Sequence, residues 1–277
     1  MNPASPQPDG RPSKRAGGDV KIIDAHCHLY DEPGYLDQLL RTMDRCGIEK
    51  SCLSGIGPLF NCLGDKEVQA AFLSHPDRLI GAVFIRPGID SPDRIDDANQ
   101  NGFRMVKVSL PLESYHDRSY FPLWERCEKH RMPVLFHTGI VTPRREAPEE
   151  MISSWNMHPM SIEPITRAFP DLKIIVAHLG IHWNTDAAEL ARMRPNVYVD
   201  LTGEPGGWRV RGDAVGMDKW LWWPNAFDKV VFGTDVHYSK IERILREDRW
   251  RLDRLGIGNE TRRKIFAGNI LELLGEG

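Results

Sequence analysis

Short apolar runs rich in β-branched residues alternate with longer amphipathic stretches from about residue 21 to the C-terminus. Eight of these runs are seven to nine residues long and end in glycine, proline or a polar turn, which is typical of buried strands. The runs cover residues 21–28, 49–56, 79–87, 103–110, 133–139, 173–180, 197–203 and 230–238.

The stretches between the runs carry apolar residues at helical spacing. In Tyr35–Cys46, leucine and methionine recur every three or four positions and Gly47 follows as a stop. Further helices are predicted at Phe121–His130, at Ile162–Phe169 and at Glu260–Leu274, with Asn259 as the N-cap of the last one.

Eight strands that alternate with helices over about 250 residues predict a single (β/α)₈ barrel. A doubly wound open sheet is the alternative, but the chain has no glycine-rich phosphate-binding motif. We therefore expect one domain over residues 20–277. Residues 1–19 are rich in proline, glycine and polar residues, so we expect a disordered tail there.

Chemically active side chains stand near the ends of four predicted strands. His26 and His28 close the first strand, His137 the fifth, His178 the sixth and Asp235 the eighth. Catalytic groups of (β/α)₈ enzymes come from the C-terminal ends of the strands. Because alternate residues of a strand share a face, His26 and His28 project together and form half of a divalent metal site.

Composition and charge argue against some classes of partner but do not identify the activity. The formal net charge of −3 gives no basic field for a nucleic-acid or membrane partner, and no run approaches the ~18 apolar residues of a membrane helix. Five scattered cysteines are an odd number without a CxxC pair, which favours a reducing compartment, and we expect the cytoplasm.

The ordered motifs resemble the amidohydrolase superfamily, in the amidohydrolase-2 branch that includes aminocarboxymuconate semialdehyde decarboxylase and pyrone-dicarboxylate lactonase. The resemblance covers nearly all of residues 21–275. It rests on IDAHCH, SHPDRLIGAVFIRP, FPLWERCEKHRMPVLFHTG, RAFPDLKIIVAHLG, PNVYVDLTG, KVVFGTDVHY and IFAGNILELLG.

This resemblance implies one divalent metal held by His26, His28, His137 and Asp235. His178 would act as the acid or base, or as a further ligand, and Asp235 would also take part in catalysis. Zinc suits the nitrogen-rich set, with manganese or iron as alternatives because a carboxylate takes part. Lactonases of this branch also work without a metal, and family members often form homodimers.

Other polar residues of the predicted loops are candidates for binding a small substrate. An arginine and an indole suit a planar carboxylated molecule. Lys107, on the fourth strand, is expected to be structural or to face the substrate rather than to be carboxylated. The substrate-binding candidates are Lys107, Arg144, Glu204, Trp208 and Arg209.

Three functions remain open. The first is a metal-dependent hydrolase that attacks an amide, ester or lactone with a metal-activated water. The second is a nonoxidative decarboxylase on the same site, although the γ-resorcylate type begins with ExH and this chain has DAHCH. The third is a noncatalytic barrel, which a closed or metal-free site would support.

Overall fold

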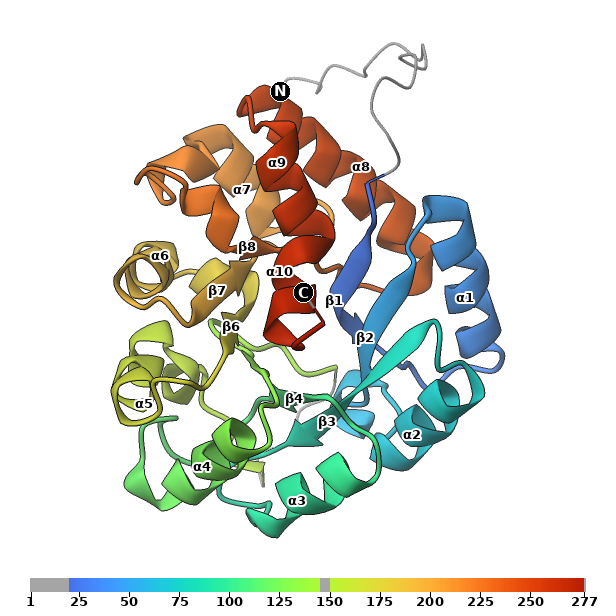
Figure 1. The fold of residues 1–277 in the computed structure, drawn as a ribbon, viewed down its shortest axis with the longest axis vertical. Coiled ribbons are helices and arrows are strands. Elements are labelled where there is room, and N and C mark those ends of the chain that lie inside the picture. The colour runs from blue at the N-terminus through green and yellow to red at the C-terminus, as the bar shows by residue number, and fades with distance from the viewer. Residues whose placement is uncertain (1–19, 145–149, 277) are drawn as a thin grey trace.

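The computed structural model describes residues 20–144 and 150–276, and the predicted tail at residues 1–19 lies outside them. Eight parallel strands follow one another around a single sheet in chain order, with helices on the outside (Figure 1). This arrangement confirms the predicted (β/α)₈ barrel. The strands are β1 Ile23–His28, β2 Lys50–Ser54, β3 Leu79–Ile85, β4 Met105–Val108, β5 Val134–Phe136, β6 Ile174–Val176, β7 Val197–Asp200 and β8 Val230–Val231.

Backbone hydrogen bonds between the first and last strand segments close the ring. The N–H of Ala25 donates to the carbonyl of Phe232 at 3.0 Å, and the N–H of Asp235 donates to the carbonyl of His26 at 2.7 Å. The second bond fixes the C-terminal end of the eighth segment directly beside the two histidines of β1.

The helices follow the strands as the alternating pattern predicts. Tyr35–Cys46 is helical over the predicted range, with Leu39 and Met43 buried and Gly47 at φ 69° as the C-cap. The helices are α1 Tyr35–Cys46, α2 Asp65–Ser74, α3 Asp93–Gln100, α4 Phe121–Lys129, α5 Glu163–Ala168, α6 Asn184–Met193, α7 Trp208–Val215, α8 Tyr238–Arg254, α9 Asn259–Arg263 and α10 Asn269–Leu273.

The predicted C-terminal helix is interrupted. A π-helical turn over Lys264–Gly268 separates α9 from α10, and Gly258 rather than Asn259 is the N-cap. The N–H of Phe232 donates to the carbonyl of Ile265 at 2.8 Å, so this carbonyl bonds to the barrel wall. A side contact of this kind is a known cause of a break in the helical ladder.

The eighth predicted strand is too long. Regular pairing stops at Val231, and Tyr238 already begins α8. Asp235 has φ 49°, which is outside the strand region, and therefore the chain turns at the residue that carries the candidate chemistry.

Two hydrophobic layers hold the barrel. The larger lies between the strands and the outer helices. The smaller fills the barrel, and α10 seals its N-terminal end, where Ile270 and Leu273 pack against Ile23 and Leu135. In Figure 1, α10 lies across the middle of the ring. The opposite end, where the strands finish, is left for the polar residues of the site.

Candidate active site

A cavity of about 260 Å³ opens at the C-terminal ends of the strands, where the sequence predicted the site. Its floor holds the histidines and Asp235, and its walls are largely apolar. The lining residues are His26, His28, Tyr30, Ile56, Phe60, Cys62, Lys107, Ser109, His137, Ile140, Val141, Thr142, Arg144, His178, Ile181, Gly203, Glu204, Trp208 and Asp235.

Three imidazoles turn the same ring nitrogen toward the carboxylate of Asp235. The distance to this carboxylate is 3.0 Å from Nε2 of His28, 3.5 Å from Nε2 of His26 and 3.6 Å from Nε2 of His178. Donor atoms of His26, His178 and Asp235 all lie within 4.8 Å of one another. Nitrogen and carboxylate donors at this separation suit a divalent first-row metal.

Each of these imidazoles is held at its other nitrogen. Nδ1 of His26 lies 2.9 Å from Oδ2 of Asp200, and Nδ1 of His28 lies 2.9 Å from Oγ of Ser54. Nδ1 of His178 lies 2.7 Å from Oγ1 of Thr202. Ring nitrogens anchored in this way leave the opposite nitrogens to face a ligand, as in protein metal sites.

The directions of these hydrogen bonds fix two tautomers. Oδ1 of Asp200 lies 2.6 Å from Oγ1 of Thr202, and a carboxylate can only accept, so the hydroxyl donates to it. The hydroxyl oxygen then accepts the Nδ1–H of His178. His26 likewise donates its Nδ1–H to Asp200. With its single ring proton on Nδ1, each of these imidazoles presents a lone pair at Nε2.

Asp200, Thr202 and Ser54 hold the candidate histidines in place, and the sequence reasoning missed them. Asp200 ends the apolar run VYVD on β7 and is fully buried, as is Thr202 two residues later. Burial acts to raise the pKa of Asp200, but the hydrogen bond and positive charge of His26 outweigh it and hold the pKa below its usual range. The signal that could have identified Asp200 in the sequence is an acidic residue at the end of an apolar strand.

His137 lines the same cavity and lies beside His178. Its Nδ1 lies 3.2 Å from Nε2 of His178, and its Nε2 is buried without a hydrogen-bond partner among the described residues. Burial, with the positive charges of His178 and Lys107, holds the pKa of His137 well below its usual range. Because Nε2 of His178 carries a lone pair, Nδ1 of His137 donates to it, and the unpartnered Nε2 of His137 is left with a lone pair that faces the cavity. Its role as a metal ligand stays a prediction.

Asp235 remains a carboxylate in this setting. Burial acts to raise its pKa, but the surrounding histidines, His26 first, hold the pKa well below the usual range. The neighbouring Thr234 donates from its hydroxyl to Asp24 at 2.6 Å and from its N–H at 3.0 Å. Asp24 therefore positions the turn that carries Asp235.

Lys107 points into the cluster from β4. Its side chain is buried, and Nζ lies 2.8 Å from Nε2 of His26. Burial lowers the pKa of Lys107 to about 8. Burial also lowers the pKa of His26 to about 4, and the charge of Lys107 acts in the same direction. At neutral pH the pair is thus an ammonium beside a neutral imidazole.

Three of the predicted substrate contacts lie at the cavity. Arg144, Glu204 and Trp208 line its rim, and the N–H of Arg144 donates to the carbonyl of Leu59 at 2.8 Å. Glu204 is engaged by Nζ of Lys240 at 2.7 Å. The indole N–H of Trp208 donates to the carbonyl of Thr202 at 2.9 Å, which fixes this ring beside the histidine cluster.

The fifth candidate, Arg209, does not line the cavity, so the described residues give no support to its predicted role in substrate binding. Its side chain is fully buried and pairs with Asp248 of α8. Consecutive residues of a helix point about 100° apart, so α7 can turn only one of Trp208 and Arg209 toward the substrate. Trp208 takes that position and Arg209 faces α8.

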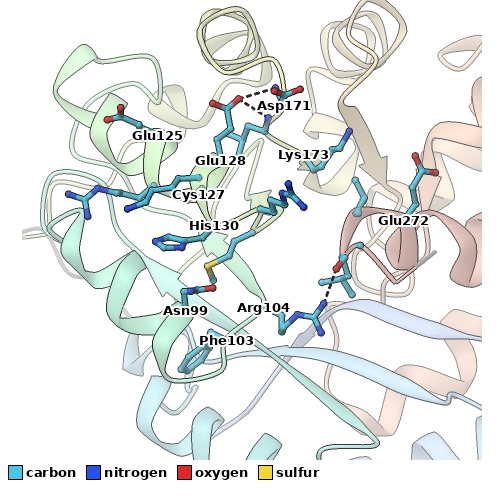
Figure 2. A pocket seen from close by; sticks show the side chains of 18 residues that line it. Asn99, Phe103, Arg104, Glu125, Cys127, Glu128, His130, Asp171, Lys173 and Glu272 are labelled. Atoms are coloured by element: carbon cyan, nitrogen blue, oxygen red, sulfur yellow. Dashed lines mark hydrogen bonds between the residues drawn. The ribbon is translucent and has the colours of Figure 1, made fainter.

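A larger hollow, of about 1140 Å³, lies at the N-terminal ends of the strands. Arg104 donates to the carbonyl of Leu274 at 2.8 Å, and Glu128 accepts from the backbone N–H groups of Asp171 and Leu172 (Figure 2). The charged groups lining it include exposed acids as well as bases, and the histidines of the candidate site are absent from its lining. This hollow is therefore separate from the candidate site.

No helix among residues 20–144 and 150–276 is long and apolar enough to cross a membrane. A search of curated protein sequences found no match. Among solved structures, an uncharacterized TIM-barrel protein from Bordetella bronchiseptica is similar, with 20% identity and a TM-score of 0.70. The match covers 93% of this chain and 99% of that one.

Two further solved structures carry functional names. A probable 2-pyrone-4,6-dicarboxylic acid hydrolase from Acinetobacter baumannii is 14% identical, with a TM-score of 0.64 and coverage of 92% and 100% of the two chains. A dihydroxybenzoic acid decarboxylase from Polaromonas, solved with manganese and an inhibitor, is 16% identical, with a TM-score of 0.62 and coverage of 93% and 97%. At these identities the likeness concerns the fold.

The family assignment rests on the sequence itself. The model of the family described as Amidohydrolase, of the amidohydrolase-2 type, matches residues 63–275, which is most of the chain and includes His137, His178 and Asp235. The HxH strand lies before the matched range, and the structure places it beside Asp235. The chain belongs to the amidohydrolase-2 family of enzymes.

Proposed function

We propose that this protein is a metal-dependent hydrolase that cleaves an amide, ester or lactone bond in a small carboxylated or cyclic substrate. One observation carries the proposal. The Nε2 atoms of His26, His28 and His178 all face Asp235, while their Nδ1 atoms are fixed from behind. Such preorganisation supports a centre built to bind a metal and act on water.

The metal would be held by His26, His28 and Asp235, with His137 or His178 completing the set. Zinc is the first expectation from the nitrogen-rich donors, and manganese or iron are the alternatives. The manganese in the Polaromonas decarboxylase supports the second choice. When bound, such an ion lowers the pKa of a coordinated water and polarises a substrate carbonyl.

Asp235 and His178 would move the protons. The water oxygen forms a bond to the carbonyl carbon, and its proton passes to Oδ2 of Asp235 or to Nε2 of His178, which are 3.6 Å apart. The scissile bond then breaks and the leaving oxygen or nitrogen takes that proton. Because neutral His178 holds its own proton at Nδ1, it fits a base that becomes an acid, rather than a direct donor to the carbonyl.

The shape and lining of the cavity suggest the kind of substrate. Its volume of about 260 Å³ is at the small end of ligand sites, which suits a molecule with one ring. Phe60 and Trp208 offer aromatic walls, and the guanidinium of Arg144 can bind a carboxylate with two hydrogen bonds. A cyclic carboxylated compound, such as the pyrone dicarboxylate named for the Acinetobacter protein, fits these features.

A nonoxidative decarboxylase is the second candidate. The same His178, once protonated at Nε2, can deliver a proton to carbon as carbon dioxide leaves, and the aromatic walls suit a hydroxybenzoate. The Polaromonas protein of the same fold is named for that reaction. A noncatalytic barrel is the remaining alternative.

The test is metal analysis of the purified protein followed by paired assays. One assay follows hydrolysis of lactones, beginning with 2-pyrone-4,6-dicarboxylate, and the other follows release of carbon dioxide from dihydroxybenzoates. We expect one metal per chain, hydrolysis, and loss of turnover in His178→Asn but not in the matched control His75→Asn on the C-terminus of α2. Carbon dioxide release without hydrolysis would establish the decarboxylase, and no turnover in either assay with a closed site would support the noncatalytic barrel.

A further inference from the structure

Lys107 contacts one of the nitrogens that are proposed to hold the metal. It is the third residue of β4, and only 2% of its surface is exposed. Its Nζ lies 2.8 Å from Nε2 of His26, the same nitrogen that lies 3.5 Å from Oδ1 of Asp235. The ammonium is therefore placed at the ring of donors itself and not behind it.

The direction of this contact follows from the other side of the imidazole. His26 donates its Nδ1–H to Asp200, so Nε2 carries the lone pair. An ammonium is a donor only, and the hydrogen bond therefore runs from Lys107 to His26. A metal ion would need that same lone pair, and a single lone pair cannot serve both partners.

Position acts in the same direction as the hydrogen bond. The nitrogen that Lys107 contacts lies 3.5 Å from Oδ1 of Asp235, so Nζ sits beside the acidic group of the centre. A cation held at this position would repel a dication placed beside His26 and Asp235.

We propose that Lys107 is a built-in competitor of the metal, whose ammonium binds Nε2 of His26 in the metal-free protein and must withdraw before a metal can bind. Lys107 therefore lowers the metal affinity of the centre and makes the metal exchangeable. This inference rests on the proposed metal centre and adds a residue that opposes it.

The experiment measures metal affinity directly. Metal-free wild type, Lys107→Met and Lys107→Gln are titrated with Zn²⁺ and with Mn²⁺ in competition with a chromogenic chelator. We expect both variants to bind either ion about ten-fold more tightly or better, at the low end of the effects that side chains around a metal have on its affinity. Circular dichroism and the melting temperature establish that each variant is folded.

Lys173→Met is the matched control. Lys173 is exposed in the hollow at the opposite end of the barrel (Figure 2), so its loss removes the same charge far from the histidines. We expect the metal affinity of this variant to equal that of the wild type. An equal gain in Lys173→Met and Lys107→Met would show a general charge effect and overturn the inference.

The remaining outcomes separate the inference from the proposed function. Unchanged affinity in both Lys107 variants, with one metal bound, overturns the competitor role and leaves the metal centre standing. Weaker binding, or two metals per chain with a mass increase of one carbon dioxide on Lys107, makes this residue a ligand and also overturns the competitor role. Binding of no metal by any variant overturns both proposals.

Discussion

Asp200 accepts a hydrogen bond from Nδ1 of His26 at 2.9 Å, at a point where at most 1% of either side chain is exposed. The other carboxylate oxygen of Asp200 accepts from the hydroxyl of Thr202 and from the backbone N–H of His178 at 2.7 Å. One buried carboxylate thus sets the orientation of two histidines from different strands. It links the predicted metal ligand His26 to the predicted acid or base His178.

Replacing Asp200 by asparagine is expected to weaken metal binding about 10- to 100-fold. One carboxylate oxygen of Asp200 accepts from His26 and the other accepts from Thr202. Asparagine has a single side-chain oxygen, so it can accept from only one of these two groups. It must therefore turn an NH₂ group toward either His26 or Thr202. Chelator competition measures the affinity, and nitrogen chemical shifts of labelled histidine report the tautomers.

The matched control for this prediction is Asp171→Asn, since Asp171 is exposed in the hollow at the other end of the barrel (Figure 2). Its metal affinity and histidine shifts should match those of the wild type. If Asp200→Asn also kept both, Asp200 would contribute only to packing.

The strand-end residues could be predicted because the barrel has a simple geometry. Parallel strands finish at one edge, and alternation places His26 and His28 on one face, which the structure reproduces around Asp235. The residues that hold these histidines were missed. Ser54, Asp200 and Thr202 act through distances across β2 and β7 that no local pattern reveals.

The sequence also could not show which side chains of a short helix point toward the cavity. Trp208 and Arg209 are neighbours in the sequence, and only packing against α8 decides which of them reaches the cavity. The length of β8 was overestimated for a similar reason. The run from residue 230 to 238 is apolar enough for a strand, but Asp235 adopts a positive φ that ends the ladder.

Asp24 gives a prediction about pH and stability. Burial raises the pKa of this carboxyl to about 7, although Thr234 and the N–H of His26 donate hydrogen bonds to it. In the unfolded chain the carboxyl ionises near its ordinary pKa of 3.8, so the folded state binds more protons between these values. The contribution of Asp24 to the free energy of unfolding therefore falls as pH rises from about 4 to about 7.

The variant Asp24→Asn carries no such charge, and its amide matches the shape of the acid. The free energy of unfolding of Asp24→Asn relative to wild type should therefore rise across this window, by up to about 4 kcal/mol. Urea unfolding at several pH values measures this difference. Asp37→Asn, an exposed position on α1, should show a flat difference, and a flat difference for Asp24→Asn would mean that its pKa is not raised.

Arg144→Met tests the proposed carboxylate contact. Loss of a charged hydrogen-bonding partner is worth about 1.5–3 kcal/mol, which corresponds to about a 10- to 100-fold increase in KM for a carboxylated substrate. We expect kcat to change little, because Arg144 lies on the rim and not among the histidines. Steady-state kinetics measures both constants. Arg131→Met at the opposite end of the barrel should leave KM unchanged, and a fall in kcat alone would place Arg144 in the chemical step.

Asp248→Asn tests the buried ion pairs behind the cavity. Asp248 pairs with both Arg209 and Arg251, and Arg251 has a second partner in Asp213 at 2.6 Å. Arg209 has two further nitrogens without partners among the described residues, so its buried charge depends on Asp248. Removal of that charge should cost about 3–5 kcal/mol of stability, measured by urea unfolding.

Asp248→Asn should also weaken substrate binding, because α7 carries both Arg209 and the cavity residue Trp208. Trp208 precedes Arg209 in this helix, and its indole is hydrogen-bonded beside the histidine cluster. Loosening the contact between α7 and α8 should therefore raise KM as well as lower stability. Asp253→Asn is the control, because Asp253 is 68% exposed beside Arg262 and a surface pair contributes no more than about 1 kcal/mol. Equal stability losses in the two variants would show that Arg209 does not depend on Asp248, and α7 would then be held in place by its apolar contacts.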